Sequence, residues 1–135
     1  NAIRNGLIGL GLLAVVMFLP RLVKALRGVR QKLTTPDLKR CLDDHEDILI
    51  LDVRDAPDFA SNGGHIPGAI NIPLAEVQSR LGELEAWRQR PIAVVCRTNK
   101  KSSTAAELLR SEGFSQVLLV DDGITGWSGN GFQME

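Results

Sequence analysis

Residues 92–113 read IAVVCRTNKKSSTAAELLRSEG, and they divide into a short apolar strand, a polar loop and a helix. The run at 92–95 contains only apolar and mostly β-branched side chains, which is typical of a strand covered on both faces. The helix is expected over 102–112, where small and aliphatic residues can pack, and Gly113 ends it. A strand that passes directly into a helix is the repeating unit of parallel α/β sheets, so this stretch predicts an α/β fold.

The rest of the chain continues the same alternation. Further strands are expected at 48–53, 69–72 and 117–120, helices over 36–43 (with Thr35 as the N-cap) and 74–86, and helical turns at 57–61 and 123–127. This order predicts a central, mostly parallel sheet flanked by helices. We expect this α/β domain to span residues 34–135.

The charges of the 135-residue chain are divided unevenly. The sixteen Lys and Arg residues balance sixteen Asp and Glu residues, so the formal net charge is zero. Residues 1–33 nevertheless hold six bases and no acid, whereas residues 34–135 hold ten bases and all sixteen acids. Such asymmetry is typical of a basic or membrane-proximal segment joined to a separate domain, and we expect no nucleic-acid partner.

The basic segment surrounds an uncharged run, GLIGLGLLAVVMFL, at residues 6–19. Fourteen residues are fewer than the roughly 17–25 that a spanning helix needs. The span can be extended to residues 3–23, with the flanking bases reaching toward the membrane interfaces. A secretory signal is disfavoured because the run leads into Pro20-Arg21 without a small-residue cleavage site. A buried helix of the soluble domain is disfavoured because the rest of the chain already completes a domain. Residues 1–33 are therefore expected to form an N-terminal transmembrane anchor with a basic flank.

The bases also predict an orientation. They are concentrated on the C-terminal side of the run, where Leu22, Val23, Leu26, Val29 and Leu33 continue with helical spacing along the interface. Positive flanks tend to stay inside the cell. We expect a single-pass protein of the cell membrane with its domain on the cytoplasmic side, where a free thiol is the normal state of cysteine.

Cys96 is the candidate nucleophile. It follows the strand at 92–95, and ligands of open α/β sheets bind beyond the carboxyl ends of the strands. A tight loop from this strand to the next helix would direct its amides inward and form an anion-binding nest. Arg97, Lys100 and Lys101 add three cations within five residues, which favours the thiolate form of the cysteine. The alternative is an inert core thiol.

Three blocks of sequence resemble the rhodanese (sulfurtransferase) family. The first is Asp52-Val53-Arg54, then Phe59 and the segment GHIPGAINIP at 64–73; the second is VVCRTNKKS at 94–102; the third is Gly113-Phe114 followed by GITGW at 123–127. The blocks occur in order across about residues 34–130. The resemblance implies that Cys96 takes sulfane sulfur from a donor as a persulfide and passes it to a thiophilic acceptor.

The same resemblance implies the site and its partners. The substrate-binding cradle would comprise Arg97, Thr98, Asn99, Lys100, Lys101 and Ser102. The donor would be a small sulfur-containing anion such as thiosulfate, or a persulfide, and the acceptor a thiol, including one on a protein. We expect no metal ion and no cofactor in this chemistry.

The chain departs from the common family loop, Cys-Arg-Ser-Gly-x-Arg-Ser, at three positions. Thr98, Asn99 and Lys101 replace Ser, Gly and Arg. Asn is the non-glycine residue best suited to a left-handed conformation, so we expect the loop to close with Asn99 in that region. Asp121-Asp122 also stands where small residues or glycines are usual, and it brings negative charge to the closing turn.

The supporting residues receive structural interpretations. Asp52 and Arg54 are expected to pair at a strand end, and His65 to make structural hydrogen bonds within its turn. Cys41 is expected to be an ordinary packing or surface residue, with a role in sulfur relay as the alternative.

Two other functions compete with sulfur transfer. A phosphatase of this fold would need an arginine six residues after the cysteine to hold phosphate bidentately, and that position is Ser102. A non-catalytic binding or scaffold subunit of a membrane complex would also fit the predicted anchor. An inactive relative would usually lack the cysteine, which this chain keeps.

Overall fold

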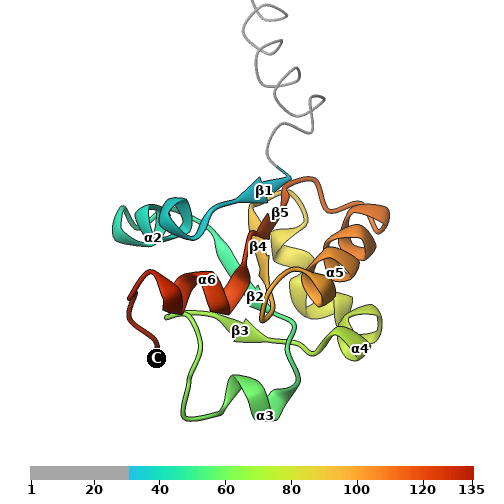
Figure 1. Ribbon diagram of the computed structural model, residues 1–135. Helices are drawn as coiled ribbons and strands as arrows, with labels where there is room; N and C mark the ends of the chain where they lie inside the picture. Colours follow the sequence, from blue (N-terminus) through green and yellow to red (C-terminus); the bar gives the residue numbers. More distant parts are fainter. Residues whose placement is uncertain (1–30) are drawn as a thin grey trace, which may run out of the picture. The chain divides into compact units, whose positions relative to one another are not determined.

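The computed structural model describes residues 31–135, which form one compact unit. The elements in chain order are β1 (Lys32–Leu33), α2 (Thr35–Asp43), β2 (Leu49–Asp52), α3 (Ala56–Phe59), β3 (Ile70–Asn71), α4 (Leu74–Val77), the 3₁₀ helix η1 (Gln78–Trp87), β4 (Ile92–Val95), α5 (Lys100–Ser111), β5 (Val117–Val120) and α6 (Gly123–Gly129). The five strands form a parallel sheet in the order β1-β5-β4-β2-β3 (Figure 1). The expected mostly parallel sheet with flanking helices is confirmed.

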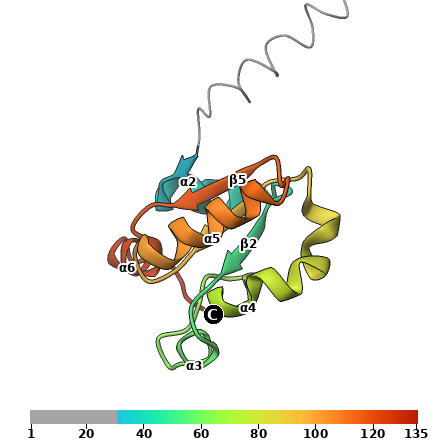
Figure 2. The same cartoon turned by 90° about the vertical axis from the view of Figure 1, so that its right-hand side faces the viewer.

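Two hydrophobic cores lie on opposite faces of this sheet. Alternate residues of β4 show the division, since Ile92 and Val94 join one core while Ala93 and Val95 join the other. The first core is covered by α4, η1 and α5, and the second by α2 and α6 (Figures 1 and 2). All four β4 side chains are fully buried. This explains why the strand at 92–95 is apolar at every position.

The sheet begins before the expected domain start at residue 34. Lys32 and Leu33 pair with Leu119 and Val120 of β5, and the buried Leu33 side chain packs in the second core. The expectation that Leu33 continues an interfacial helix was therefore wrong. The parallel ladder supplies partners for its backbone, and the core takes its side chain. The anchor expected at residues 3–23 lies outside the described residues. Within residues 31–135, no helix is long and apolar enough to cross a membrane.

The helix expected over 74–86 is interrupted. α4 ends at Val77, and a 3₁₀ helix follows with a non-helical residue at Arg80 (φ −113°, ψ 19°). The Ser79 hydroxyl donates to the Glu76 carbonyl, and Gly82 adds a second weak helix former. Val77 and Leu84 remain fully buried, so the segment keeps its apolar contacts despite the break.

His45 provides a stability prediction at the end of α2. It has a left-handed φ of 53°, and hydrogen bonds from His45 N to the Leu42 carbonyl and from Glu46 N to the Cys41 carbonyl close the helix. His45→Gly is expected to stabilise the domain by about 0.5–1 kcal/mol, because glycine adopts this conformation without strain. Urea unfolding measures this gain. His45→Ala should give no gain, and a lower midpoint for the glycine variant would contradict the interpretation.

Candidate active site

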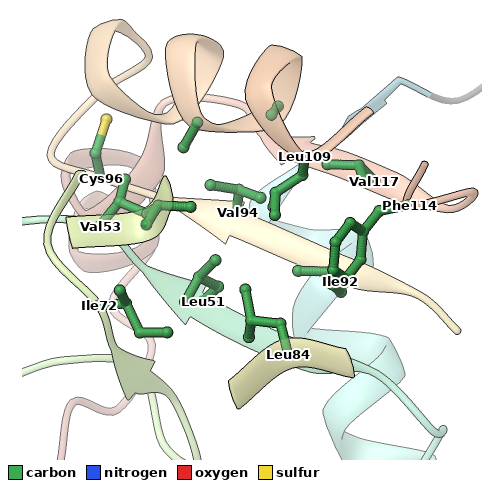
Figure 3. Close-up of a cluster of buried hydrophobic side chains, with 13 residues drawn as sticks. Leu51, Val53, Ile72, Leu84, Ile92, Val94, Cys96, Leu109, Phe114 and Val117 are labelled. Atoms are coloured by element: carbon green, nitrogen blue, oxygen red, sulfur yellow. The ribbon is translucent and has the colours of Figure 1, made fainter. Parts of the chain in front are cut away.

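Cys96 lies at the junction between β4 and the loop that leads into α5 (Figure 3). It is 3% exposed, and its side chain belongs to the core on the α5 face of the sheet. The Cys96 Sγ accepts a hydrogen bond from the Ser102 amide at 3.3 Å and donates one to Ser102 Oγ at 3.2 Å. The thiol is thus held at the N-terminal end of a twelve-residue helix, where the helix dipole favours negative charge.

α5 begins at Lys100, two residues earlier than the expected start at Ser102. The amide of Ser102 lies in the first turn, where helix amides have no partner within the helix. It is this amide that meets the sulfur. The contact between residues six positions apart therefore uses an amide that the helix itself leaves unpaired.

The N-terminal turn of α6 is hydrogen-bonded to the backbone of the cysteine loop. The carbonyls of Cys96 and Arg97 accept hydrogen bonds from Ile124 N (2.9 Å) and Thr125 N (3.0 Å). In a trans peptide the N–H points opposite to the C=O, so the amides of Arg97 and Thr98 point away from α6. Sequence reasoning did not find this support. The residues that donate these hydrogen bonds belong to the block at 123–127. The sequence marks this block only by its resemblance to the family pattern.

The loop has amides that are available to an anion. Within residues 31–135, the backbone N–H groups of residues 97–101 have no protein acceptor, and that of Ser102 donates to the cysteine sulfur. Successive amides of this kind at a helix N-terminus form an anion-binding nest. These unpaired donors beside Cys96 are compatible with the expected nest, which stays a prediction.

The side chains predicted to bind substrate divide into three groups. Ser102 is buried and contacts Cys96, whereas Arg97, Thr98, Lys100 and Lys101 are exposed around the loop. Lys101 Nζ lies 3.4 Å from the carboxylate of Asp55, just before α3. Asn99 is half-buried and bonds to the turn between β5 and α6. The substrate-binding role of residues 97–102 stays a prediction.

Asn99 does not adopt the expected left-handed conformation. Its φ is −133° and its ψ is −14°, so its backbone lies outside the left-handed region. The loop closes instead through hydrogen bonds of the Asn99 side chain, to Asp121 Oδ1 at 3.1 Å and from Asp122 N at 3.0 Å. The left-handed residue is Asp122, with φ 62°. Asp tolerates this region better than most side chains.

A buried ion pair stabilises the strand next to Cys96. Arg54 donates to both carboxylate oxygens of the fully buried Asp52 at 2.9–3.1 Å, and also to the Gly64 carbonyl at 2.9 Å. Asn71 Nδ2 donates to the Asp52 and Arg54 carbonyls. The expected pairing of Asp52 and Arg54 is confirmed. A bidentate, fully hydrogen-bonded pair of this kind fixes the end of β2 beside β4.

His65 makes structural contacts, as expected. Its ring stacks on Phe59 with centroids 3.8 Å apart, and Nδ1 lies 3.1 Å from the Phe59 carbonyl. Its backbone exchanges hydrogen bonds with Glu135. Within residues 31–135, no group of three or more His, Cys, Asp or Glu side chains is arranged to hold a metal ion.

Cys41 is in a different environment from Cys96. Burial and a hydrogen bond with Glu46 raise the pKa of the Cys41 thiol to about 11. Both effects disfavour the thiolate, which is the nucleophilic form. Cys41 is therefore a poor candidate for sulfur relay.

The pKa of Cys41 predicts a distinctive pH dependence. At pH 8 only about 0.1% of this thiol is ionised, so its alkylation by iodoacetamide should be slow. Because the pKa is raised, the rate should increase about tenfold per pH unit from pH 7 to pH 10 without a plateau. Mass spectrometry of the Cys41 peptide in a Cys96→Ser background measures this rate. A plateau near pH 9, the behaviour of an ordinary thiol, would contradict the assignment.

Comparison with known proteins decides the family. The rhodanese-like domain model matches residues 34–130, which is most of the chain. The chain belongs to the rhodanese-like family. The match covers most of the described unit, and the cysteine loop and the three resembling blocks lie inside it.

Individual relatives share about a third of their residues with this rhodanese-like chain. It is 35% identical over 91 residues to the putative sulfur carrier protein YrkF of Bacillus subtilis, covering 67% of this chain and 47% of the relative. It is 35% identical over 80 residues to the thiosulfate sulfurtransferase GlpE of Shewanella oneidensis, covering 59% and 75%. The solution structure of a rhodanese-like domain from Anabaena superposes with a TM-score of 0.67 at 32% identity, covering 76% of each chain.

Some relatives are considerably longer than the matched region. The chain spans about half the length of two of the curated relatives it matches, 47% of YrkF and 58% of the Escherichia coli protein YibN. The similarity therefore describes the rhodanese-like domain rather than the whole of those proteins.

Proposed function

We propose that the chain is a sulfurtransferase in which Cys96 carries sulfur as a persulfide. The observation that carries this proposal is the position of Cys96 Sγ at the N-terminus of α5, beside the unpaired amides of residues 97–101. These amides would stabilise the anionic donor as it arrives and the negative charge that develops on sulfur. The sulfurtransferases among its relatives support the same chemistry.

The reaction has two balanced steps. The Cys96 thiolate attacks the outer sulfur of thiosulfate, forming the S–S bond of the persulfide while the bond to the inner sulfur breaks and sulfite leaves with the electron pair. A thiophilic acceptor such as cyanide or a thiolate then attacks the terminal sulfur. The persulfide S–S bond breaks, the acceptor carries the sulfur away, and the Cys96 thiolate is restored.

The donor is proposed to be a small sulfur-containing anion such as thiosulfate, or a persulfide, and the acceptor a thiol. Arg97 and Lys100 are exposed on the cysteine loop. Their positive charge would attract an anionic donor and increase its local concentration. GlpE of Shewanella oneidensis, which is named a thiosulfate sulfurtransferase, supports thiosulfate as the first donor to test.

The 135-residue chain is expected to release thiocyanate from thiosulfate and cyanide, measured by the colour of the ferric complex. A low-molecular-weight persulfide should serve as an alternative donor. If the folded protein turns over neither donor, the non-catalytic binding or scaffold function replaces sulfur transfer. The burial of Cys96, only 3% exposed, is the observation that favours this second candidate, because a donor must reach the sulfur through a nearly closed surface.

We also propose that residues 3–23 attach the protein to the cell membrane, with the domain on the cytoplasmic side. The support is the apolar run at 6–19 and the concentration of bases after it. The chain should remain in the pellet after alkaline carbonate extraction of membranes. A protein released by carbonate would be peripheral, and a domain labelled by an impermeant thiol reagent in intact cells would have the opposite orientation.

A further inference from the structure

The structure brings together two places where the sequence departs from the common pattern of its family. Asn99 follows the cysteine in the loop, and Asp121-Asp122 lies 22 residues further along, between β5 and α6. The Asn99 amide nitrogen donates to Asp121 Oδ1 at 3.1 Å, and its oxygen accepts from the Asp122 amide at 3.0 Å. The two departures are thus the two halves of one contact.

The backbone of Asn99 is connected to the residues that hold the sulfur. Its carbonyl accepts hydrogen bonds from Ser103 N at 2.9 Å and from Ser102 Oγ at 3.2 Å. The hydroxyl and the amide of Ser102 are in turn the partners of Cys96 Sγ. A change in the position of Asn99 would therefore move the first turn of α5 and the donors at the cysteine.

The Asn99 amide also restrains a carboxylate close to the loop. Asp121 is half-buried, and Asn99 Nδ2 fixes one of its oxygens. Without this donor the carboxylate would lose the hydrogen bond that fixes it beside the loop. A carboxylate near the nest would repel an anion that approaches Cys96.

We propose that Asn99 is a positioning residue for the anion nest around Cys96, acting through its side-chain contact with Asp121 and Asp122. Asn99 holds the loop against the β5–α6 turn and keeps one oxygen of the Asp121 carboxylate hydrogen-bonded. The consequence for catalysis rests on the proposed sulfur transfer, whereas the effect on the nest does not.

The first test uses alkylation of Cys96 in a Cys41→Ser background, because alkylation needs no sulfur transfer. The ratio of the rate with iodoacetate to the rate with neutral iodoacetamide reports how well the nest accepts an anion. Asn99→Ala removes the contact without changing the net charge, and this ratio should fall about five- to tenfold, the effect of losing one or two hydrogen bonds. Asn62→Ala, at an exposed loop position, is the matched control and should leave the ratio unchanged.

A swap of the two side chains provides the second test. Asn99→Asp places two carboxylates together and should lower the ratio further. Adding Asp121→Asn should restore it to within about twofold of the wild-type ratio, since the amide and the carboxylate have exchanged positions and one hydrogen bond can form again. The swap also keeps the test decisive if Asn99→Ala does not fold.

The same variants should change sulfur loading in parallel, mainly through the KM for thiosulfate rather than through kcat. An Asn99→Ala ratio equal to that of wild type, or a double variant no better than Asn99→Asp, would overturn the positioning role. Wild-type protein that transfers no sulfur while the alkylation ratios behave as expected would overturn only the proposed function.

Discussion

Cys96→Ser is expected to reduce thiocyanate release by about a thousandfold or more, to the level without protein. A serine hydroxyl neither ionises near neutral pH nor forms a persulfide, so the first step has no nucleophile. The substitution changes one atom, and a hydroxyl can keep a hydrogen bond to Ser102, the present partner of the thiol. The loss should therefore arise from chemistry and not from unfolding.

Cys41→Ser is the control for this prediction. Cys41 lies on α2, and its ionisation is suppressed by burial and by Glu46. The variant should keep the wild-type kcat and KM within about twofold. Loss of activity in Cys41→Ser, or residual turnover above about one per cent in Cys96→Ser, would contradict the assignment of a single catalytic thiol.

Gly123→Ala should have the largest effect on stability, because it affects the support of the cysteine loop directly. A Cβ at this position would lie 2.1 Å from the Cys96 carbonyl oxygen and 2.8 Å from that of Thr98. The residue also has a positive φ of 46°. Left-handed strain and overpacking together should cost about 3 kcal/mol or more in the free energy of unfolding. If the cysteine loop moves to make room for the new methyl group, the hydrogen bonds from Ile124 and Thr125 are lost and sulfur loading should fall.

Gly131→Ala separates the two causes. Gly131 has a similar positive φ of 73°, but a Cβ there would meet nothing within 4 Å. This variant should lose only the cost of a left-handed alanine, about 1–2 kcal/mol, and should load sulfur at the wild-type rate. Urea unfolding and loading of both variants provide the comparison. Equal stability and equal loading for Gly123→Ala and Gly131→Ala would show that α6 does not support the loop.

The sequence predicted those parts of the fold that have a simple physical pattern. β2, β4 and β5 are short apolar runs buried by helices, and α5 follows β4 directly. β1 could not be found in this way. It has two residues at the end of a basic segment, and it becomes a strand only because β5 offers a free edge. The 3₁₀ geometry of η1 could not be predicted either. Val77, Leu81 and Leu84 keep helical spacing across the break, so the apolar pattern does not show it.

The sequence predicted the position of Cys96 but not the role of the Asn99 side chain. The position of Cys96 at the carboxyl end of a strand follows from the order of elements, whereas its contact with Ser102 was not predicted. The role of the Asn99 side chain depends on a residue 22 positions away. Local conformational preference suggested a left-handed backbone for Asn99, whereas tertiary hydrogen bonds gave it a different one.

The mass of the Cys96 peptide after exposure to a donor tests the central claim most directly. The 135-residue chain is reduced, incubated with excess thiosulfate in the absence of any acceptor, freed of small molecules and digested without reductant. The peptide containing Cys96 should gain the mass of one sulfur atom, and the gain should disappear after addition of cyanide. The Cys41 peptide should remain unchanged. A folded protein whose Cys96 gains no sulfur from thiosulfate or from a persulfide donor would contradict the proposal that Cys96 is a sulfur carrier.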